Sequence, residues 1–362
     1  MAGFEAGRDV GAALAVVLDG RLVVDVWSGH RDRKKTEPWA RDTLCCLFSA
    51  TKGVTALCIL QAVSEGVLDL DEPVVSCWPE FDCNDKSAIT LRHILSHQAG
   101  LVGFHDPVTA ELFYDWPALC SALAKETPWW VPGEKHGYHA RTFGYLLGEV
   151  LGRKTGITVS GWLKDRLANM LELDLHIGLR AADLHRCAQM LPARVKAGQD
   201  TVPESARRMM KSFNDLSTPT GAAFQNPSFG PGFMNSERFR MADMPAMNGH
   251  GTARDLARLY GAIPSLLDPE VLAEASSTQS YGMDVVLQSV SHFGLGFMIH
   301  DEKAPIGAVS GSFGHAGAGG SMAFYDPLNR IGFCFVMNQM QQGVVTGGIS
   351  ATECADKVYD CL

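Results

Sequence analysis

The 362 residues are enough to bury a large core and to form two lobes. Their formal net charge of −9, spread without a block of like charges, argues against nucleic acid and anionic membranes as partners. No apolar run reaches the roughly 18 residues of a membrane-spanning helix, the N-terminus shows no signal-peptide pattern, and the ten cysteines include no Cys-x-x-Cys pair, so we expect a cytoplasmic protein with reduced thiols.

The chain opens with a predicted β-hairpin. Residues Ala12–Leu18 and Arg21–Trp27 form two β-rich runs, and Asp19-Gly20 between them is a strong two-residue turn signal. Residues 30–43 are charged and contain a proline, so we expect a loop that leads into the next motif.

That motif is Ser-x-x-Lys, formed by Ser49 and Lys52 at the start of a predicted helix. The apolar run Val54–Val63 follows without Pro or Gly, and Glu65-Gly66 ends it as a helix would end. Residues three apart share a helix face, so the Lys52 amine can lie beside the Ser49 hydroxyl. A serine needs such a base to become a nucleophile, and an amine in an apolar setting is one way to supply it.

Two histidines farther along have spacing that suits a metal. Thr90 is a plausible N-cap for a short helix, Leu91–His97, on which His93 and His97 lie four residues apart. No Glu follows His93 and no third ligand is evident. We therefore expect structural roles for both histidines, and neither a metal nor another cofactor.

Tyr138 is a second candidate site residue. It stands where a Pro/Gly/aromatic loop, residues 128–140, meets a predicted helix over 141–152. The residue pattern leaves two interpretations open. Such a tyrosine can be a half-buried packing residue, or a phenol that shares its proton with a nearby amine.

The middle of the chain is predicted to cover a site. From 186 to 249 the periodicity fades, and repeated Pro and Gly break the chain, which is typical of functional covers in a compact protein. The cover contains the aromatic residues Phe213, Phe224, Phe229, Phe233 and Phe239. Thr252 then caps a helix predicted over Ala253–Ala262.

The C-terminal part returns to strands, which predicts an α+β fold. Strands are expected at Gly294–His300, Ser312–His315, Ser321–Tyr325 and Ile331–Met337, and a last helix at Ile349–Tyr359. Strands from both ends of the chain must then pair in one antiparallel sheet, with helices beside it. We expect a sheet lobe from residues 1–45 and 290–362 and a helical lobe from 46–289, with Ser49 in the cleft between them.

A glycine-rich stretch, Phe313–Ser321, completes the candidate site. Glycines at this density in a strand pattern indicate that something approaches the backbone closely. A strand edge there can present an N–H to a developing oxyanion, with the Ser49 N–H as its partner. A bulged strand end explains the same pattern equally well.

Three motifs together resemble the serine β-lactamase/penicillin-binding-protein superfamily, and within it the family VIII carboxylesterases. They are Ser49-x-x-Lys52, Tyr138-His139-Ala140 and His315-Ala316-Gly317, in the family's order. The resemblance implies a β-lactamase-like fold in which Ser49 is the nucleophile and Lys52 and Tyr138 transfer protons. It also implies an oxyanion hole from the N–H groups of Ser49 and Ala318. The substrate would contact His315, Gly317, Ala140 and, in the cover, Phe229.

The departures from the family's pattern point to esters as substrates. Relatives that cleave lactams usually have Asn where Ala140 stands and Lys-Thr-Gly or similar where His315-Ala316-Gly317 stands. A further departure is that relatives often have a helix before the first strand, whereas this chain begins almost at the strand. The less covered sheet face would favour a homo-oligomer.

The expected activity is hydrolysis of small carboxylic esters by two-step acyl transfer. We expect the Lys52 cation to lower the pKa of Tyr138, which then accepts the Ser49 proton. Four alternatives remain. They are an acyltransferase that uses a small alcohol or amine, a β-lactamase or D-Ala-D-Ala peptidase, a Ser-His-Asp hydrolase, which the absence of Gly-x-Ser-x-Gly disfavours, and a binding protein without activity.

Overall fold

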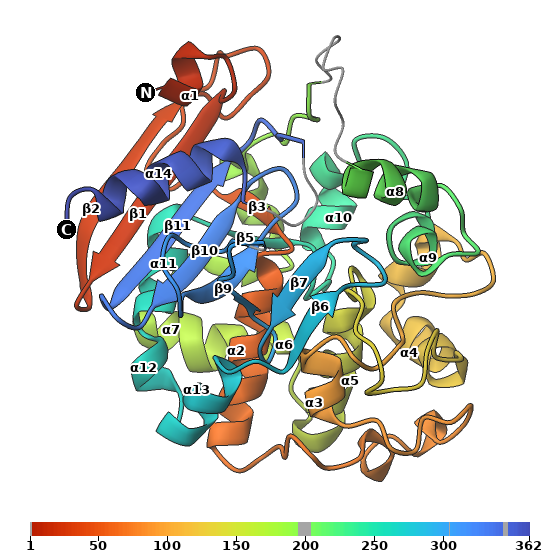
Figure 1. The fold of residues 1–362 in the computed structure, drawn as a ribbon. Helices are drawn as coiled ribbons and strands as arrows, with labels where there is room; N and C mark the ends of the chain where they lie inside the picture. Colours follow the sequence, from red (N-terminus) through yellow and green to blue (C-terminus); the bar gives the residue numbers. More distant parts are fainter. Residues whose placement is uncertain (1, 195–203, 304, 343–346) are drawn as a thin grey trace.

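The computed structural model describes residues 2–194, 204–303, 305–342 and 347–362, and shows a sheet flanked by helices (Figure 1). The strands are β1 Gly11–Leu18, β2 Arg21–Gly29, β3 Cys45–Phe48, β4 Leu175–Ile177, β5 Gly249–Gly251, β6 Ser280–Met283, β7 Val290–Phe293, β8 Met298–Ile299, β9 Phe313–Ala316, β10 Met322–Asp326 and β11 Ile331–Met337. The helices are α1 Ala2–Glu5, α2 Thr51–Ser64, α3 Leu91–Leu95, α4 Trp116–Lys125, α5 Thr142–Thr155, α6 Val159–Trp162, α7 Asn169–Leu171, α8 Glu204–Phe213, α9 Pro219–Gln225, α10 Glu237–Met241, α11 Ala253–Gly261, α12 Ile263–Leu266, α13 Pro269–Ala275 and α14 Ile349–Tyr359.

The two ends of the chain build one antiparallel sheet, which confirms the predicted α+β architecture. Its eight strands lie in the order β2-β1-β11-β10-β9-β8-β7-β6. β1 pairs with β11 from Ala12 opposite Met337 to Leu18 opposite Ile331. The hairpin, β11 and α14 were predicted closely. The sheet nevertheless begins earlier in the chain than the predicted boundary at 290, because β6 at Ser280–Met283 forms its edge.

A second, small sheet was not expected from the sequence. β3, β5 and β4 pair antiparallel in that order. These strands have three or four residues each, too few for an alternating pattern to be recognised. The small sheet matters for function because β3 ends one residue before Ser49.

Helix α2 runs between the sheet and the helical half of the molecule (Figure 1). Every residue from Thr51 to Ala62 is buried, so the helix has no solvent-facing stripe. It contacts α5 and α13 as well as β9. The predicted apolar helix is thus a central element of the core, held from several sides.

The predicted cover is more regular than the sequence indicated. Short helices α8, α9 and α10 lie within it, and residues 195–203 fall outside the described part. Thr218 and Ser236 cap α9 and α10 by accepting a backbone N–H. Proline and glycine between these helices conceal them, because each helix is too short to show a clear apolar period.

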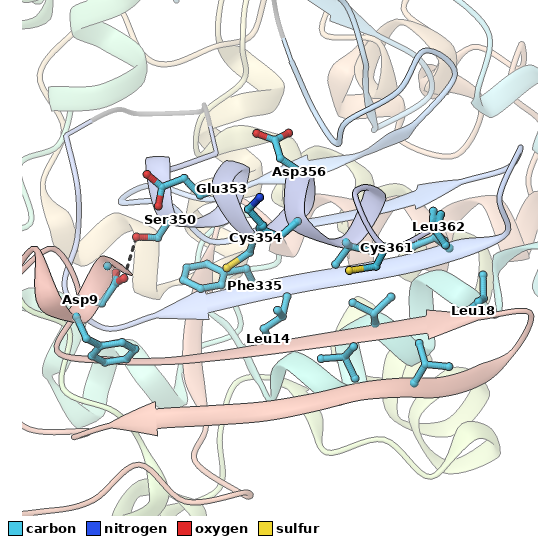
Figure 2. Close-up of a pocket in the computed structure, with 18 residues that line it drawn as sticks. Asp9, Leu14, Leu18, Phe335, Ser350, Glu353, Cys354, Asp356, Cys361 and Leu362 are labelled. Atoms are coloured by element: carbon cyan, nitrogen blue, oxygen red, sulfur yellow. Dashed lines mark hydrogen bonds between the residues drawn. The ribbon is translucent and has the colours of Figure 1, made fainter. Parts of the chain in front are cut away.

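The outer face of the sheet carries an apolar groove of about 790 Å³ between α14 and the β1–β2 hairpin (Figure 2). Leu14, Leu18 and Phe335 line its floor, and a hydrogen bond of 2.8 Å from Ser350 to Asp9 closes one end. Contrary to the sequence interpretation, a helix does precede β1, but α1 has only four residues. α1 covers little of this face, and α14 lies along it beside the groove (Figure 1).

Three chemical features accompany the fold. All ten cysteines are free thiols. Among the described residues, no helix has the length and apolar character needed to cross a membrane. Within the same residues, no three His, Cys, Asp or Glu side chains gather as a metal site would require.

Candidate active site

Ser49 lies at a sharp junction between β3 and α2. Phe48, the residue before it, has a φ of +47°, in the left-handed region that aromatic residues rarely adopt. This backbone turn leaves Ser49 half-exposed, while Phe48 and Thr51 beside it are buried. Strained backbone of this kind clusters at functional sites, where surrounding structure holds it in place.

Lys52 lies one helical turn farther on and is completely buried. Its Nζ is 3.4 Å from Ser49 Oγ, and it donates hydrogen bonds to the carbonyl oxygens of Ala140, at 2.7 Å, and Ala246, at 3.0 Å. Within the described residues Lys52 forms no ion pair, and burial lowers its pKa well below the ordinary 10.5. Three oxygens, the two carbonyls and the Ser49 hydroxyl, thus lie within hydrogen-bond reach of the Lys52 amine. Its neutral form, which burial favours, has a lone pair that can accept the Ser49 proton.

Tyr138 lies over the same amine. Lys52 Nζ is 4.7 Å from the centroid of the Tyr138 ring, and the tyrosine is fully buried. Burial raises the pKa of Tyr138 although the nearby Ser49 hydroxyl lowers it. The prediction of a lowered phenol pKa is therefore wrong, because burial removes the water that would stabilise a phenolate. Tyr138 is a neutral phenol that can donate a proton.

His315 closes the site from strand β9. Its ring centroid lies 6.0 Å from that of Tyr138, and its Nδ1 pairs with the Ala316 carbonyl at 2.7 Å. Burial, and secondly the Lys52 amine, lower its pKa to about 3, so the imidazole is neutral at pH 7. The next glycine, Gly317, fits because a Cβ there would lie 2.2 Å from the Leu47 carbonyl oxygen.

A tight turn after β9 presents a second backbone donor. Gly320 N–H bonds to the Gly317 carbonyl at 3.1 Å, and Gly319 has a φ of +85°, which together define a type II turn. Ala318 is its half-exposed second residue. In the described part of the chain, neither the Ala318 N–H nor the Ser49 N–H has a hydrogen-bond partner. The pair is available to bind a developing oxyanion.

Two residues predicted to contact the substrate also have partners within the protein. The Ala140 carbonyl oxygen accepts a hydrogen bond from Lys52. Phe229 packs on the Arg141 guanidinium, 5.0 Å from its ring centroid, and on Phe233. The cover residue whose ring stacks on Tyr138, at 6.4 Å, is Phe224.

Sequence reasoning also missed several groups around the site. The Ala246 carbonyl gives no sequence signal, because every residue has one. His97 was predicted to be structural; its imidazole Nδ1 accepts the His139 N–H at 3.1 Å. His93, the other histidine predicted to be structural, completes the capping box of Thr90 at the start of α3. The role of Asp284, which accepts the Tyr138 N–H, was not foreseen.

Comparisons with known proteins show which family the chain belongs to. The sequence matches the family described as Beta-lactamase over residues 2–349. The chain belongs to the beta-lactamase family. It is 34% identical to the esterase/beta-lactamase LipL of Mycobacterium tuberculosis, covering 94% of this chain and 80% of LipL.

Two solved structures agree with this membership. A family VIII carboxylesterase superposes with a TM-score of 0.89 at 31% identity, covering 100% of this chain and 95% of the other. A penicillin-binding-protein homologue from Caulobacter crescentus superposes with a TM-score of 0.88 at 34% identity, with the same coverage. The beta-lactamase-like fold inferred from the three motifs is confirmed.

Proposed function

We propose that this carboxylesterase-type serine hydrolase cleaves esters of small carboxylic acids through an acyl-enzyme on Ser49. The observation that carries the proposal is the placement of Lys52, a fully buried amine beside Ser49 that donates to two backbone carbonyls and whose neutral form is favoured by burial. Its lone pair can accept the Ser49 proton at 3.4 Å. Lys52 is thus the proton acceptor, in place of the Tyr138 phenolate that the sequence suggested.

The steps follow from this assignment. Lys52 takes the Ser49 proton as the hydroxyl oxygen attacks the ester carbonyl, and the resulting oxyanion binds the N–H groups of Ser49 and Ala318. The neutral Tyr138 phenol gives its proton to the departing alcohol and is reprotonated by Lys52. Water then attacks the acyl-enzyme, and the same proton transfers in reverse order release the acid and free Ser49. If an added alcohol takes the place of water, the same residues transfer the acyl group to it and the enzyme acts as an acyltransferase.

The groups that face the substrate favour esters over lactams. Ala140 offers no side-chain donor, and His315, with a pKa of about 3, carries no charge at pH 7. A lactam's amide and carboxylate would lose water without gaining partners, at about 1–3 kcal/mol for a neutral group and more for a charge. Short esters lack both groups and pay nothing. The proposal therefore predicts that the enzyme cleaves short esters better than lactams.

Two measurements on one preparation test the proposal. We expect a higher kcat/KM for a p-nitrophenyl ester than for a chromogenic cephalosporin, and an acyl-enzyme mass on the peptide that contains Ser49. Equal or better turnover of the cephalosporin would overturn the ester assignment. The Ser49→Ala variant should fold, lose hydrolysis and resist fluorophosphonate labelling, whereas labelling of another serine would refute the nucleophile.

A homo-oligomer is a separate part of the proposal. β2 is an edge strand, and its side chains Leu22, Val23, Val26 and Trp27 are exposed. Long apolar edges pair with other strands unless charges protect them. Antiparallel pairing of β2 with its copy would continue the sheet and cover its apolar side chains. We expect a dimer by light scattering that Val26→Lys dissociates; a monomer at tens of micromolar would contradict it.

A further inference from the structure

The loop that carries Tyr138 is held by hydrogen bonds that three successive backbone N–H groups donate. The Gly137 N–H bonds to the His97 carbonyl at 3.0 Å, and the His139 N–H bonds to His97 Nδ1 at 3.1 Å. Between them, the Tyr138 N–H bonds to Asp284 Oδ1 at 3.2 Å. Three consecutive N–H groups in a loop thus have partners outside it, which leaves the Tyr138 backbone little freedom.

Asp284 is built into a different part of the molecule. It follows β6, in the connection to β7, and has no exposed surface. Its Oδ1 also accepts the N–H groups of Val286 and Leu287, each at 2.8 Å. Its Oδ2 accepts the Ser291 hydroxyl at 3.1 Å. One carboxylate therefore closes the β6–β7 connection and reaches across to the Tyr138 loop.

The surroundings keep this carboxylate in one orientation. Ser291 Oγ lies 3.0 Å from His136 Nε2, and the Val285 N–H bonds to the His136 carbonyl at 3.2 Å, so the β6–β7 connection and the Tyr138 loop are joined on both sides. Burial raises the pKa of Asp284 to about 6, against the hydrogen bonds that lower it. Above that pKa the group is a carboxylate, and charged acceptors form the stronger hydrogen bonds.

We propose that Asp284, with His97 on the other side, is a positioning residue that fixes the Tyr138 phenol relative to Lys52 and Ser49. In the part of the chain that the structure describes, the Asp284 carboxylate bonds to backbone N–H groups and the Ser291 hydroxyl, and not to the side chains of Ser49, Lys52 or Tyr138. It acts by setting the backbone from which the Tyr138 ring projects over the Lys52 amine, 4.7 Å from the ring centroid. A shift of about 1 Å in such a group costs on the order of 10²-fold in rate. The inference rests on the proposed role of Tyr138 in proton transfer.

The chain offers a matched control for this carboxylate. Asp326 is also fully buried and also caps a turn, with Oδ1 accepting the N–H groups of Leu328, at 2.9 Å, and Asn329, at 3.3 Å. Its Oδ2 accepts the Tyr359 hydroxyl at 2.7 Å. Asp326 lies at the end of β10 and contacts none of the three site residues. Its removal should cost stability as the removal of Asp284 does, without the same loss of rate.

The test compares kcat and KM for a p-nitrophenyl ester in these variants. We expect Asp284→Ala to lower kcat about 10- to 100-fold with KM changed less than about threefold. Asp284→Asn keeps an acceptor oxygen and should stay within about fivefold of the wild-type kcat. Asp326→Ala should keep kcat within about twofold. If Asp284→Ala does not fold, Asp284→Glu, which displaces the carboxylate by one methylene, should lower kcat about 10-fold relative to Asp326→Glu.

A double variant shows whether the effect passes through Tyr138. In a Tyr138→Phe background, Asp284→Ala should lower kcat by less than about a further twofold, because the effects of residues that act as a unit are not additive. If Tyr138→Phe is strongly slowed but still measurable, a wild-type kcat in Asp284→Ala, or full additivity in the double variant, would overturn the inference. Wild-type activity in Tyr138→Phe alone would instead overturn the proposed role of Tyr138.

Discussion

Replacing Lys52 by methionine separates the two candidates for the base. Methionine keeps the length and apolar packing of the side chain but cannot accept a proton. General-base catalysis contributes typically 10²- to 10⁴-fold, so kcat/KM for a p-nitrophenyl ester should fall by about that factor. The variant also leaves the carbonyls of Ala140 and Ala246 without a donor, at about 1–3 kcal/mol each, offset in part because no amine is buried.

Lys86 provides the matched control. It is also fully buried, and its Nζ donates to the Glu126 carbonyl at 2.7 Å and lies 3.4 Å from Cys83 Sγ. Lys86→Met should change the thermal midpoint by an amount similar to Lys52→Met, and should leave kcat/KM within about twofold. A Lys52→Met protein that retains more than a tenth of the wild-type kcat/KM would refute the assignment of Lys52 as base.

The pH profile gives an independent measurement on the wild-type enzyme. The reactive form of Lys52 is the neutral amine, and burial lowers its pKa well below 10.5. Activity is therefore lost as pH falls through that lowered pKa and is constant above it. A phenolate base would behave differently, because the pKa of Tyr138 is raised by burial. A rate that continues to rise beyond pH 10 would support the tyrosine instead.

Two further substitutions test the oxyanion hole and the fold. Ala318→Pro suits the second position of a type II turn and replaces the N–H by a ring carbon, so kcat should fall by at least about 10²- to 10³-fold while the thermal midpoint holds. A kcat within threefold of wild type would exclude the Ala318 N–H from the oxyanion hole. Thr90→Ala removes the cap that accepts the His93 N–H at the start of α3 and should cost about 1 kcal/mol in the free energy of unfolding, measured by denaturant titration, with kcat unchanged; an unchanged midpoint would show that the cap adds nothing.

The sequence by itself determined the elements whose signals are local. The turn at Asp19-Gly20, the apolar run after Lys52 and the cap at Thr90 each act over a few residues, so hairpin, helix and cap could be predicted. The Ser-x-x-Lys spacing likewise brings Ser49 and Lys52 to one helix face. The protonation state of that pair does not follow from spacing, since it depends on how much water the fold removes.

Only the tertiary structure decided the electrostatics and the long-range partners. Complete burial lowers the pKa of Lys52 and raises that of Tyr138, whereas the sequence led us to expect a lowered pKa for Tyr138. The carbonyl of Ala246 and the carboxylate of Asp284 meet the site from 194 and 146 residues away in the chain. Backbone carbonyls have no sequence signature, and a lone aspartate resembles any turn residue. Desolvation and contacts across the chain arise from packing, so no local pattern of residues could have revealed them.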